Sequence, residues 1–359
     1  GALRETGYRG ISKKCRDYRK GDGERQMKRA AIIGMGDIYP IHMAAIQADP
    51  QITLCAVCDS DEAKEGQAPQ GVPFYRDYKE MIRAEKPDCV HICLPHYLHY
   101  PVAKEAAGMG VHVFCEKPMA VSTAEAEAFS RLEMDYPKLQ IGICLQNRRN
   151  ETVELLKTFI DSKEYGSVTG IRGNVPWYRP KEYYDCKPWR GRWETAGSGC
   201  MMNQAIHTLD LLSYLGGKIR GVRATVSQIL DYGIEVEDTV SASLDYENGA
   251  RGLFMATNAN FKNEPVQIVV QMEKGEFRIY DNILYQVMED GTVKKLAEDR
   301  KMPGTKFYYG ASHQKLISEF YHSLETGERS YVSAKDGEMS IRLICGILRA
   351  GETGAYISL

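Results

Sequence analysis

Short apolar runs alternate with amphipathic segments along the first 146 residues of the chain. The apolar runs predict strands at residues 30–34, 52–58, 89–94, 111–115 and 139–145, and the segments between them predict helices at 41–48, 61–67, 78–85, 100–108 and 123–133. Strands and helices that alternate with short connections are typical of a doubly wound parallel sheet. The strands are apolar throughout, which indicates burial on both faces. We therefore predict an α/β protein whose first half holds such a sheet.

The pattern changes after residue 146. A helix at 151–161 and a strand at 168–175 lead into a loop rich in aromatic residues, proline and glycine, and a helix at 201–215 follows. From residue 219 to about 295, polar and apolar positions alternate and turn signals recur, as in an antiparallel sheet. Helices at 312–324 and 334–351 close the chain. We predict one domain over residues 27–146 and a second, α+β domain with a large, mainly antiparallel open sheet over residues 147–359.

Composition limits the classes of function. The net charge of −2 argues against a nucleic-acid partner, which a protein holds with an excess of basic residues. No apolar run approaches the roughly 20 residues that cross a bilayer, and no apolar stretch follows the basic N-terminal residues as in a secretory signal. The ten cysteines show no disulfide framework, which is typical of a reducing compartment. We expect a cytoplasmic protein with no membrane partner.

The first 26 residues have the character of a leader. Met27 stands just before the first strand, and Gly-Glu-Arg at residues 23–25 could be encoded by a purine-rich stretch that resembles a bacterial ribosome-binding site. We expect residues 1–26 to be non-native or disordered, with residues 2–26 translated from upstream sequence and Gly1 left from a tag.

A glycine motif connects the first strand to the first helix. Gly34 and Gly36 stand one residue apart, and Asp37 and Ile38 follow them. Gly34 allows a tight turn, and Gly36 lets the backbone approach a pyrophosphate at the helix N-terminus. Tyr39 replaces the third glycine of the usual motif, so the motif alone is weak support for dinucleotide binding.

Asp59 strengthens this interpretation. It ends the second strand, where a carboxylate can bind both hydroxyl groups of the adenosine ribose. The alternative is that Asp59 only caps the next helix. A carboxylate there repels the 2′-phosphate of NADP, and the neighbouring Ser60 and Asp61 offer no arginine to bind one. We therefore predict NAD as the cofactor, with NADP less favoured.

Two further segments lie at the carboxyl edge of the predicted sheet, where cofactors bind. In the first, Leu94, Pro95, His96 and His99 end or follow the strand at 89–94. His96 and His99 could contact the dinucleotide there. Near a helix start, His99 could equally well satisfy backbone groups alone.

In the second segment, Glu116, Lys117 and Pro118 follow the strand at 111–115. A lysine between a glutamate and a proline at the end of a buried strand is poorly explained as a surface charge. Its ammonium group could polarise a substrate hydroxyl and favour deprotonation. Pro118 could adopt the cis form and direct Lys117 toward the nicotinamide.

The predicted helix at 201–215 carries Asn203, His207 and Asp210 at spacings that place them on one face. In one interpretation the helix simply contains a hydrogen-bonded histidine and an aspartate near its end. In the other, His207 lies beside the nicotinamide as a general acid–base group, because imidazole titrates near neutral pH. The pattern alone leaves both interpretations open.

No metal site is predicted. Cys55 and Cys58 lie on an apolar strand, where their side chains point to opposite faces, and His91 and His112 lie within buried strands. The spacing shows no carboxylate–histidine cluster, no P-loop and no nucleophile elbow.

Together these residues resemble the Gfo/Idh/MocA family, named for glucose–fructose oxidoreductase and inositol 2-dehydrogenase. The resemblance covers about residues 28–359 and rests on Gly34-x-Gly36 with His42, Asp59, Pro95 to His99, Glu116-Lys117-Pro118, Trp189-Arg190, Gly197 to Gly199, Asn203 with His207 and Asp210, Val236 to Thr239, Ser312-His313 and Thr326 to Glu328. It implies a Rossmann domain, a homodimer or homotetramer built on the C-terminal sheet, and NAD or NADP. It also implies hydride transfer at a secondary alcohol of a sugar, cyclitol or sugar derivative.

The resemblance implies that Lys117 and His207 are the catalytic pair. Asn203 departs from the family pattern, which commonly has aspartate at this position. Because an amide cannot take a proton, His207 must carry more of that role. Asparagine also occurs there in branches of the family that act on sugar 3-hydroxyl groups.

The aromatic loop is expected to bind the carbohydrate. Aromatic faces stack on sugar C–H bonds, so Tyr178, Trp189 and Arg190 are expected to join Asn203 and His207 in the substrate site, although a buried-core role for the aromatics is an alternative. Two other functions stay open beside a dehydrogenase that releases NADH. A redox-neutral glycosidase or lyase would oxidise a sugar carbon transiently at the same site, and a regulator would bind the dinucleotide without catalysis.

Overall fold

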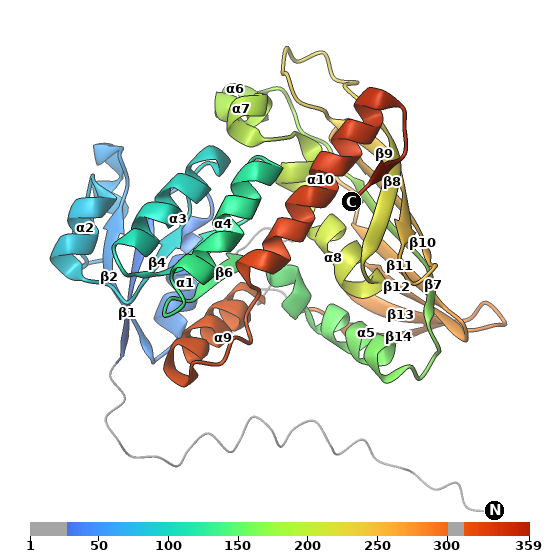
Figure 1. The fold of residues 1–359 in the computed structure, drawn as a ribbon, viewed down its shortest axis with the longest axis horizontal. Helices are drawn as coiled ribbons and strands as arrows, with labels where there is room; N and C mark the ends of the chain where they lie inside the picture. The colour runs from blue at the N-terminus through green and yellow to red at the C-terminus, as the bar shows by residue number, and fades with distance from the viewer. Residues whose placement is uncertain (1–26, 301–311) are drawn as a thin grey trace, which may run out of the picture.

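The computed structural model describes residues 27–300 and 312–359, so the expected leader lies outside the described residues. The first half forms a six-stranded parallel sheet in the order β3-β2-β1-β4-β5-β6 (Figure 1). Its strands are β1 (Lys28–Ile33), β2 (Ile52–Cys58), β3 (Phe74–Tyr75), β4 (Cys89–Ile92), β5 (His112–Glu116) and β6 (Ile141–Cys144). Every position of β4 and β6 is buried, as in strands covered on both faces. The predicted doubly wound parallel sheet is confirmed.

Helices connect these strands as the sequence pattern predicts. They are α1 (Tyr39–Ala48), α2 (Tyr78–Glu85), α3 (His99–Gly108) and α4 (Thr123–Asp135), with short 3₁₀ helices at Glu62–Gln67, His96–Leu98 and Gln146–Arg149. The helix predicted at 61–67 is therefore a 3₁₀ helix. None of its residues is buried, so no packing stabilises a longer α-helix there.

The second half forms a nine-stranded sheet in the order β14-β13-β12-β11-β7-β10-β9-β8-β15. Its strands are β7 (Val168–Pro176), β8 (Ile219–Ser227), β9 (Thr239–Tyr246), β10 (Arg251–Thr257), β11 (Gln267–Met272), β12 (Gly275–Tyr280), β13 (Ile283–Val287), β14 (Val293–Glu298) and β15 (Ile357–Ser358). Only β7 and β10 pair in parallel; the other neighbours in this sheet are antiparallel. The predicted large, mainly antiparallel sheet is confirmed.

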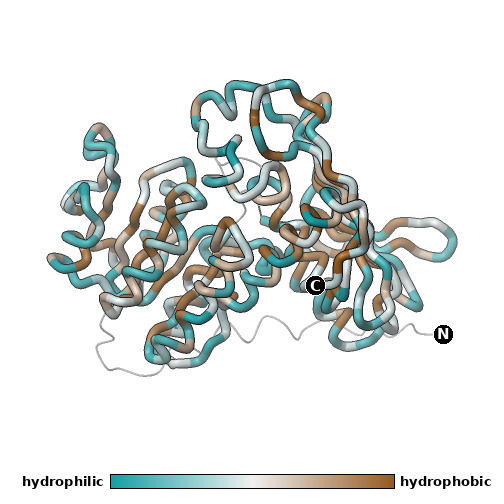
Figure 2. Tube along the Cα trace, turned by 45° about the horizontal axis from the view of Figure 1, so that its top comes forward, coloured by the Kyte–Doolittle hydropathy of each residue, from teal (hydrophilic) through white to brown (hydrophobic). Residues whose placement is uncertain are grey.

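Helices cover one face of this second sheet. The helices of this half are α5 (Glu151–Ser162), α6 (Glu182–Asp185), α7 (Trp193–Ala196), α8 (Ile206–Gly216), α9 (Ser312–Thr326) and α10 (Ala334–Thr353), with a 3₁₀ turn at Pro188–Gly191 and a π-helical turn at Met201–Ala205. Helix α8 packs on β7, α10 packs on β8 and α5 packs on β14. Figure 2 shows hydrophobic and hydrophilic stretches distributed over both halves of the molecule. On β10, buried positions alternate with exposed ones such as Leu253 and Met255. The opposite face therefore carries exposed apolar side chains.

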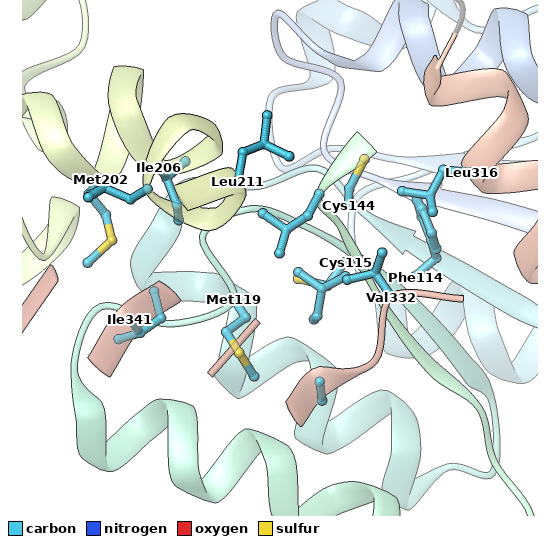
Figure 3. Close-up of a cluster of buried hydrophobic side chains, with 14 of the residues drawn as sticks. Phe114, Cys115, Met119, Cys144, Met202, Ile206, Leu211, Leu316, Val332 and Ile341 are labelled. Carbon is cyan, nitrogen blue, oxygen red and sulfur yellow. The ribbon is translucent and has the colours of Figure 1, made fainter. Parts of the chain in front are cut away.

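The two C-terminal helices join the two halves. Helix α9 packs against α1, and α10 packs against both α4 and β8 (Figure 1). Figure 3 shows the resulting junction, where apolar side chains from β5, β6, α8, α9 and α10 meet, among them Phe114, Cys144, Ile206, Leu316 and Ile341. One continuous apolar core thus extends through both halves. Among the described residues, no helix combines the length and apolar character needed to span a membrane.

Candidate active site

A cleft of about 1320 Å³ runs along the junction of the two halves. Its lining includes almost every residue that the sequence analysis singled out: Gly34, Gly36, Asp37, Ile38, Asp59, Leu94, Pro95, His96, Glu116, Lys117, Tyr178, Trp189, Arg190, Asn203 and His207. Residues from two separately predicted domains therefore meet in one cavity, which is where ligands commonly bind in such folds.

The glycine motif forms one end of the cleft. Gly34 has a φ of +97°, and a Cβ atom there would lie 2.4 Å from the carbonyl oxygen of Cys93, so only glycine fits. A Cβ atom on Gly36 would meet nothing within 4 Å and would project into open space. Ile38 precedes α1 and offers no side-chain cap to its first turn. This open approach to a helix N-terminus fits the pyrophosphate of a dinucleotide. Tyr39 is buried and does not obstruct it.

Asp59 lies at the end of β2 within the same end of the cleft. Its Oδ2 atom accepts hydrogen bonds from the Met35 amide and the Lys64 ammonium, both at 2.8 Å, and its Oδ1 atom accepts one from the Asp61 amide. Burial opposes ionisation, but these hydrogen bonds lower the pKa of Asp59 below its ordinary value. The side chain that caps the 3₁₀ helix is Asp61 instead, through the Ala63 amide. Asp59 is therefore an ionised carboxylate in the cleft, and capping does not explain it.

Lys117 extends from the end of β5 toward the second half of the chain. Its ammonium nitrogen donates a hydrogen bond of 2.9 Å to the backbone carbonyl oxygen of Asn203. Burial lowers the pKa of Lys117, opposed by the charge of Glu116 and reinforced by the positive charges of Arg190 and Arg179. The Lys117–Pro118 peptide bond is cis. Lys117 is therefore not a surface charge, because its ammonium group lies in the cleft and binds the second half of the chain.

Glu116 anchors a chain of buried hydrogen bonds behind Lys117. Its Oε1 atom lies 2.8 Å from Nε2 of His42, and Nδ1 of His42 lies 2.9 Å from Nδ1 of His91. Nε2 of His91 in turn lies 2.9 Å from the Tyr321 hydroxyl. Despite its burial, these partners and the nearby positive charge of Lys117 hold the pKa of Glu116 far below its usual range. A fixed negative charge thus lies next to the ammonium group.

His207 lies on α8 across the cleft from Lys117. The Gln146 side-chain amide approaches it with Nε2 at 3.3 Å from Nε2 of the imidazole. Because an amide NH₂ group can only donate, this imidazole nitrogen accepts and is unprotonated. Burial and then the charge of Lys117 hold the pKa of His207 well below its usual value. His207 is therefore a neutral imidazole at neutral pH, with an acceptor nitrogen beside Gln146.

Asp210 lies three residues after His207 in the regular helix α8 and, unlike Asn203 and His207, is not part of the cleft lining. Asn203 lies in the π-helical turn Met201–Ala205, so the helical register changes before α8 begins. The buried Asp210 carboxylate instead binds Arg148, at 2.7 and 2.9 Å. Arg148 also reaches Asp336 near the start of α10. This ion pair joins α8 to the end of the first sheet and lies outside the cleft lining.

His96 and His99 differ in their positions. His96 lines the cleft, donates a hydrogen bond of 2.9 Å from Nδ1 to the carbonyl oxygen of Ala196, and packs edge-on against Trp189 at 4.7 Å. His99 is not among the described residues of the cleft lining, and its two ring nitrogens lie 2.6 and 2.7 Å from backbone carbonyl oxygens. The geometry thus gives His99 the backbone-satisfying role that the sequence left open, and we do not retain it in the cofactor site.

The aromatic loop forms the opposite rim. Tyr178 is half-exposed, whereas Trp189 and Arg190 are partly buried between the two halves. The Arg190 guanidinium lies 4.1 Å from the centre of the Tyr183 ring, and the Arg179 guanidinium lies 4.8 Å from that of Trp177. Aromatic and cationic groups thus line the same cleft as Lys117.

Sequence reasoning missed several cleft residues. Gln146 directly follows β6, so the rule that identified Lys117 at a carboxyl strand end would have found it. Lys64 stands five residues after Asp59, within a segment interpreted only as a charged helix. His313, on α9, lines the cleft 3.8 Å from Glu116 and gave no local signal beyond the family resemblance. Lys187 gave none either.

The structure also brings together a group of potential metal ligands that spacing did not reveal. His42, Glu116 and Cys144 offer ligand atoms within 4.8 Å of one another, and all three are buried. Both His42 nitrogens already lie at hydrogen-bond distance from Glu116 and His91. His42, Glu116 and His91 therefore form a hydrogen-bonded group.

Comparison with known proteins supports the family resemblance. The model of the oxidoreductase family with an NAD-binding Rossmann fold (GFO/IDH/MocA) matches residues 28–141, and that of the GFO/IDH/MocA C-terminal domain matches residues 153–278. The chain belongs to the GFO/IDH/MocA family. It has the NAD(P)-binding Rossmann domain of these oxidoreductases.

Individual relatives are distant but cover most of the chain. D-xylose 1-dehydrogenase (NADP(+)) 2 of Haloferax volcanii is 25% identical over 91% of this chain and 97% of its own length. Myo-inositol 2-dehydrogenase of Thermotoga maritima is 25% identical over 88% of this chain and 93% of its own. Among solved structures, the WlbA dehydrogenase from Bordetella pertussis, in complex with NADH and UDP-GlcNAcA, is 28% identical with a TM-score of 0.81, covering 93% of this chain and 99% of that one.

Proposed function

We propose that this protein is an NAD-dependent dehydrogenase that oxidises a secondary alcohol of a sugar, cyclitol or sugar derivative. One observation carries the proposal. Lys117 from the first half and His207 from the second line one cleft, and Gly34, Gly36 and Asp59 lie at its other end. Alcohol oxidation by a dinucleotide requires a group that takes the alcohol proton and one that stabilises the resulting negative charge. The neutral imidazole and the buried cation can fill these two roles, and the glycine end of the cleft can accommodate the dinucleotide.

The residues at the glycine end fit a dinucleotide. The open space at Gly36 admits the pyrophosphate, and Asp59 can accept hydrogen bonds from the adenosine ribose. When bound, the nicotinamide of NAD accepts a hydride from the alcohol carbon. The ionised Asp59 disfavours a 2′-phosphate, which is the basis for proposing NAD rather than NADP, although one relative carries NADP(+) in its name.

The alcohol proton is the part of the reaction that this chain's own residues handle. The Nε2 atom of His207 is unprotonated and can take the proton of the substrate hydroxyl. Lys117, held by the Asn203 carbonyl oxygen, stabilises the negative charge that develops on that oxygen. The Asn203 side chain cannot accept a proton, so it serves to position the substrate.

The substrate class follows from the walls of the cleft. Trp189, Tyr178 and Arg190 offer aromatic and cationic surface to a polyhydroxylated ring. The names of the relatives point the same way, since they include a D-xylose dehydrogenase, a myo-inositol dehydrogenase and a dehydrogenase crystallised with a nucleotide sugar. The asparagine at position 203 makes oxidation at a sugar 3-hydroxyl the regiochemistry to test first.

A panel experiment tests this function. The purified protein is mixed with NAD or NADP and with pentoses, hexoses, uronic acids, cyclitols and nucleotide sugars, and nicotinamide reduction is followed by absorbance. We expect reduction of NAD by at least one carbohydrate, with a higher kcat/KM than for NADP. A protein that binds NADH but reduces no cofactor with any panel member contradicts the proposal. Cleavage of a glycoside with retained NADH and no net reduction would instead identify a redox-neutral glycosidase or lyase.

A further inference from the structure

Arg179 is a cation of the cleft whose charge no carboxylate of the described residues offsets. It lines the cleft, and its positive charge acts on Lys117, where it lowers the pKa of the ammonium group. Arg190, the other guanidinium that acts on Lys117, forms an ion pair with Asp37 at 3.0 Å. Within residues 27–300 and 312–359, the side-chain hydrogen bonds of Arg179 go to neutral oxygens instead. Its charge is therefore left for a ligand or for solvent to offset.

Neutral groups hold the Arg179 guanidinium in place. Its Nη1 atom donates hydrogen bonds to the Tyr178 carbonyl oxygen at 2.7 Å and to Oδ1 of Asn263 at 3.1 Å. It also lies 4.8 Å from the centre of the Trp177 ring and 5.5 Å from that of Tyr183. The backbone is fixed as well, because the Arg179 amide donates a hydrogen bond of 3.0 Å to the segment that follows β10. The position of this cation is thus set before any ligand binds.

The other edge of the guanidinium is free to bind. It consists of Nε and Nη2, and neither atom has a hydrogen-bond partner among the described residues. Asn263 also lines the cleft, and its Oδ1 atom accepts from the Tyr178 amide at 2.9 Å and from Arg179, so its Nδ2 group remains as a donor. The two N–H groups on one guanidinium edge match the two oxygens of a carboxylate. These donors together have the character of an oxyanion subsite.

Charge decides which oxyanion fits this subsite. Arg179 supplies one positive charge and Asn263 adds a neutral donor, which together match the single negative charge of a carboxylate. A phosphate ester carries about −1.5 to −2 charges at neutral pH, so it would call for a second cation. The other guanidinium that acts on Lys117, that of Arg190, is already paired with Asp37. A carboxylate is therefore the better match.

We propose that Arg179 and Asn263 bind a carboxylate of the substrate, so that the sugar oxidised at Lys117 and His207 is a sugar acid. This inference rests on the proposed dehydrogenase function and narrows its substrate from polyhydroxylated rings in general to anionic ones. It gives the aromatic loop a selective role beside the stacking role of its rings. A bound carboxylate also offsets the charge that Arg179 exerts on Lys117, which favours the charged form of the ammonium group when substrate is present.

Binding of matched sugars to the NADH complex tests the proposal. Dissociation constants of glucuronate and glucose, and of galacturonate and galactose, are measured by calorimetry with the protein saturated with NADH, so that no oxidation interferes. We expect each uronate to bind about 10- to 100-fold more tightly than its neutral counterpart, as charge-assisted hydrogen bonds do. Glucose 6-phosphate provides the phosphate arm and is expected to bind less tightly than glucuronate.

Two variants assign this preference to the subsite. R179M removes the cation and should abolish most of the preference for the uronates, with the affinity for the neutral sugars little changed. N263D keeps the Oδ1 atom that accepts from the Tyr178 amide and from Arg179, but gives the guanidinium a carboxylate partner. It should also abolish the preference, and it does so without removing a side chain from the loop. R192M is the matched control, because Arg192 is an exposed arginine nearby that is not part of the cleft lining.

Several outcomes would overturn the proposal. Uronates that bind no more tightly than the neutral sugars, or that do not bind, would do so, and so would a preference that R179M and N263D retain as fully as R192M. Tighter binding of glucose 6-phosphate than of glucuronate would overturn the assignment of a carboxylate. Preferential binding of uronates without reduction of NAD by any carbohydrate would support the subsite and contradict the proposed function. Oxidation of neutral sugars in preference to uronates would support the function and contradict the subsite.

Discussion

The two walls of the cleft differ in whether their buried polar groups have hydrogen-bond partners within the protein. On the first-domain wall, behind Lys117, Glu116 begins a chain of hydrogen bonds through His42 and His91 to Tyr321. On the second-domain wall, formed by Asn203, His207 and the loop with Trp189 and Arg190, the imidazole has one contact at 3.3 Å. Its Nδ1 atom and the Arg190 Nε atom have no hydrogen-bond partner among the described residues.

The difference indicates that the two walls have different roles in binding and catalysis. A buried, fully hydrogen-bonded carboxylate fixes the position and charge of its neighbour, so the first-domain wall is preorganised. Buried polar atoms without partners are rare in proteins and are often found where a ligand completes them. The second-domain wall therefore has the character of a surface that becomes complete only on binding.

The largest expected effect comes from removing one catalytic group from either wall. K117M and H207A are each expected to lower turnover by about 10²- to 10⁴-fold, the contribution of a positioned acid–base group. NADH affinity, measured by fluorescence, should change little. N203A should lose less, because its backbone carbonyl oxygen, which binds Lys117, remains.

Two outcomes would contradict the assignment of catalytic groups to the two walls. Near-full activity in K117M or H207A on a verified substrate would show that the wall carrying that residue does not supply the chemistry. A loss in N203A equal to that in H207A would assign the Asn203 side chain a direct part in positioning substrate or imidazole.

The next effect concerns the Arg148–Asp210 ion pair, which lies outside the cleft lining and joins α8 to the end of the first sheet. R148M leaves the Asp210 carboxylate buried and unpaired, so we expect the free energy of unfolding to fall by about 3–5 kcal/mol in urea titrations. R76M is the control, because Arg76 pairs with Glu62 at the surface, where both side chains are more than half exposed. It should change stability by less than about 1 kcal/mol. Equal effects in the two variants would contradict the structural role of Arg148.

The smallest effect is a shift in the pH dependence. Lys117 must be charged, and burial and neighbouring cations lower its pKa, so kcat/KM should fall on the alkaline side below the usual lysine pKa of 10.5. His207 must be neutral, and its pKa lies well below 6.5, so the acid limb should fall only at clearly acidic pH. R179M removes one cation, which raises the Lys117 pKa and moves the alkaline limb to higher pH. A pH profile of R179M that overlays that of the unmodified protein would contradict this assignment.

Sequence reasoning was most successful where one short segment defines both fold and chemistry. The strand ends at Asp59 and Lys117 and the glycines at 34 and 36 all line the cleft as expected. The sequence did not reveal the π-helical turn that holds Asn203, because spacing alone assumes a regular helix, nor the ion pair of Asp210 with Arg148. It left His99 undecided, because the carbonyl oxygens of Leu94 and Pro118 that satisfy it come together only in the folded chain.

By itself, the sequence determined the two kinds of sheet, the glycine turn, the acidic strand end, the strand-end lysine and the helical histidine, whereas the pairing of that lysine with that histidine came from the family resemblance. These features depend on local periodicity and on residue types within a few positions of one another. Only the tertiary structure decided which side chains share a cavity: Gln146 with His207, Lys64 with Asp59, and Lys187 and Arg190 with Asp37. The physical reason is that these contacts join residues from different elements, most of them far apart in the chain, and no local pattern records how those elements are brought together.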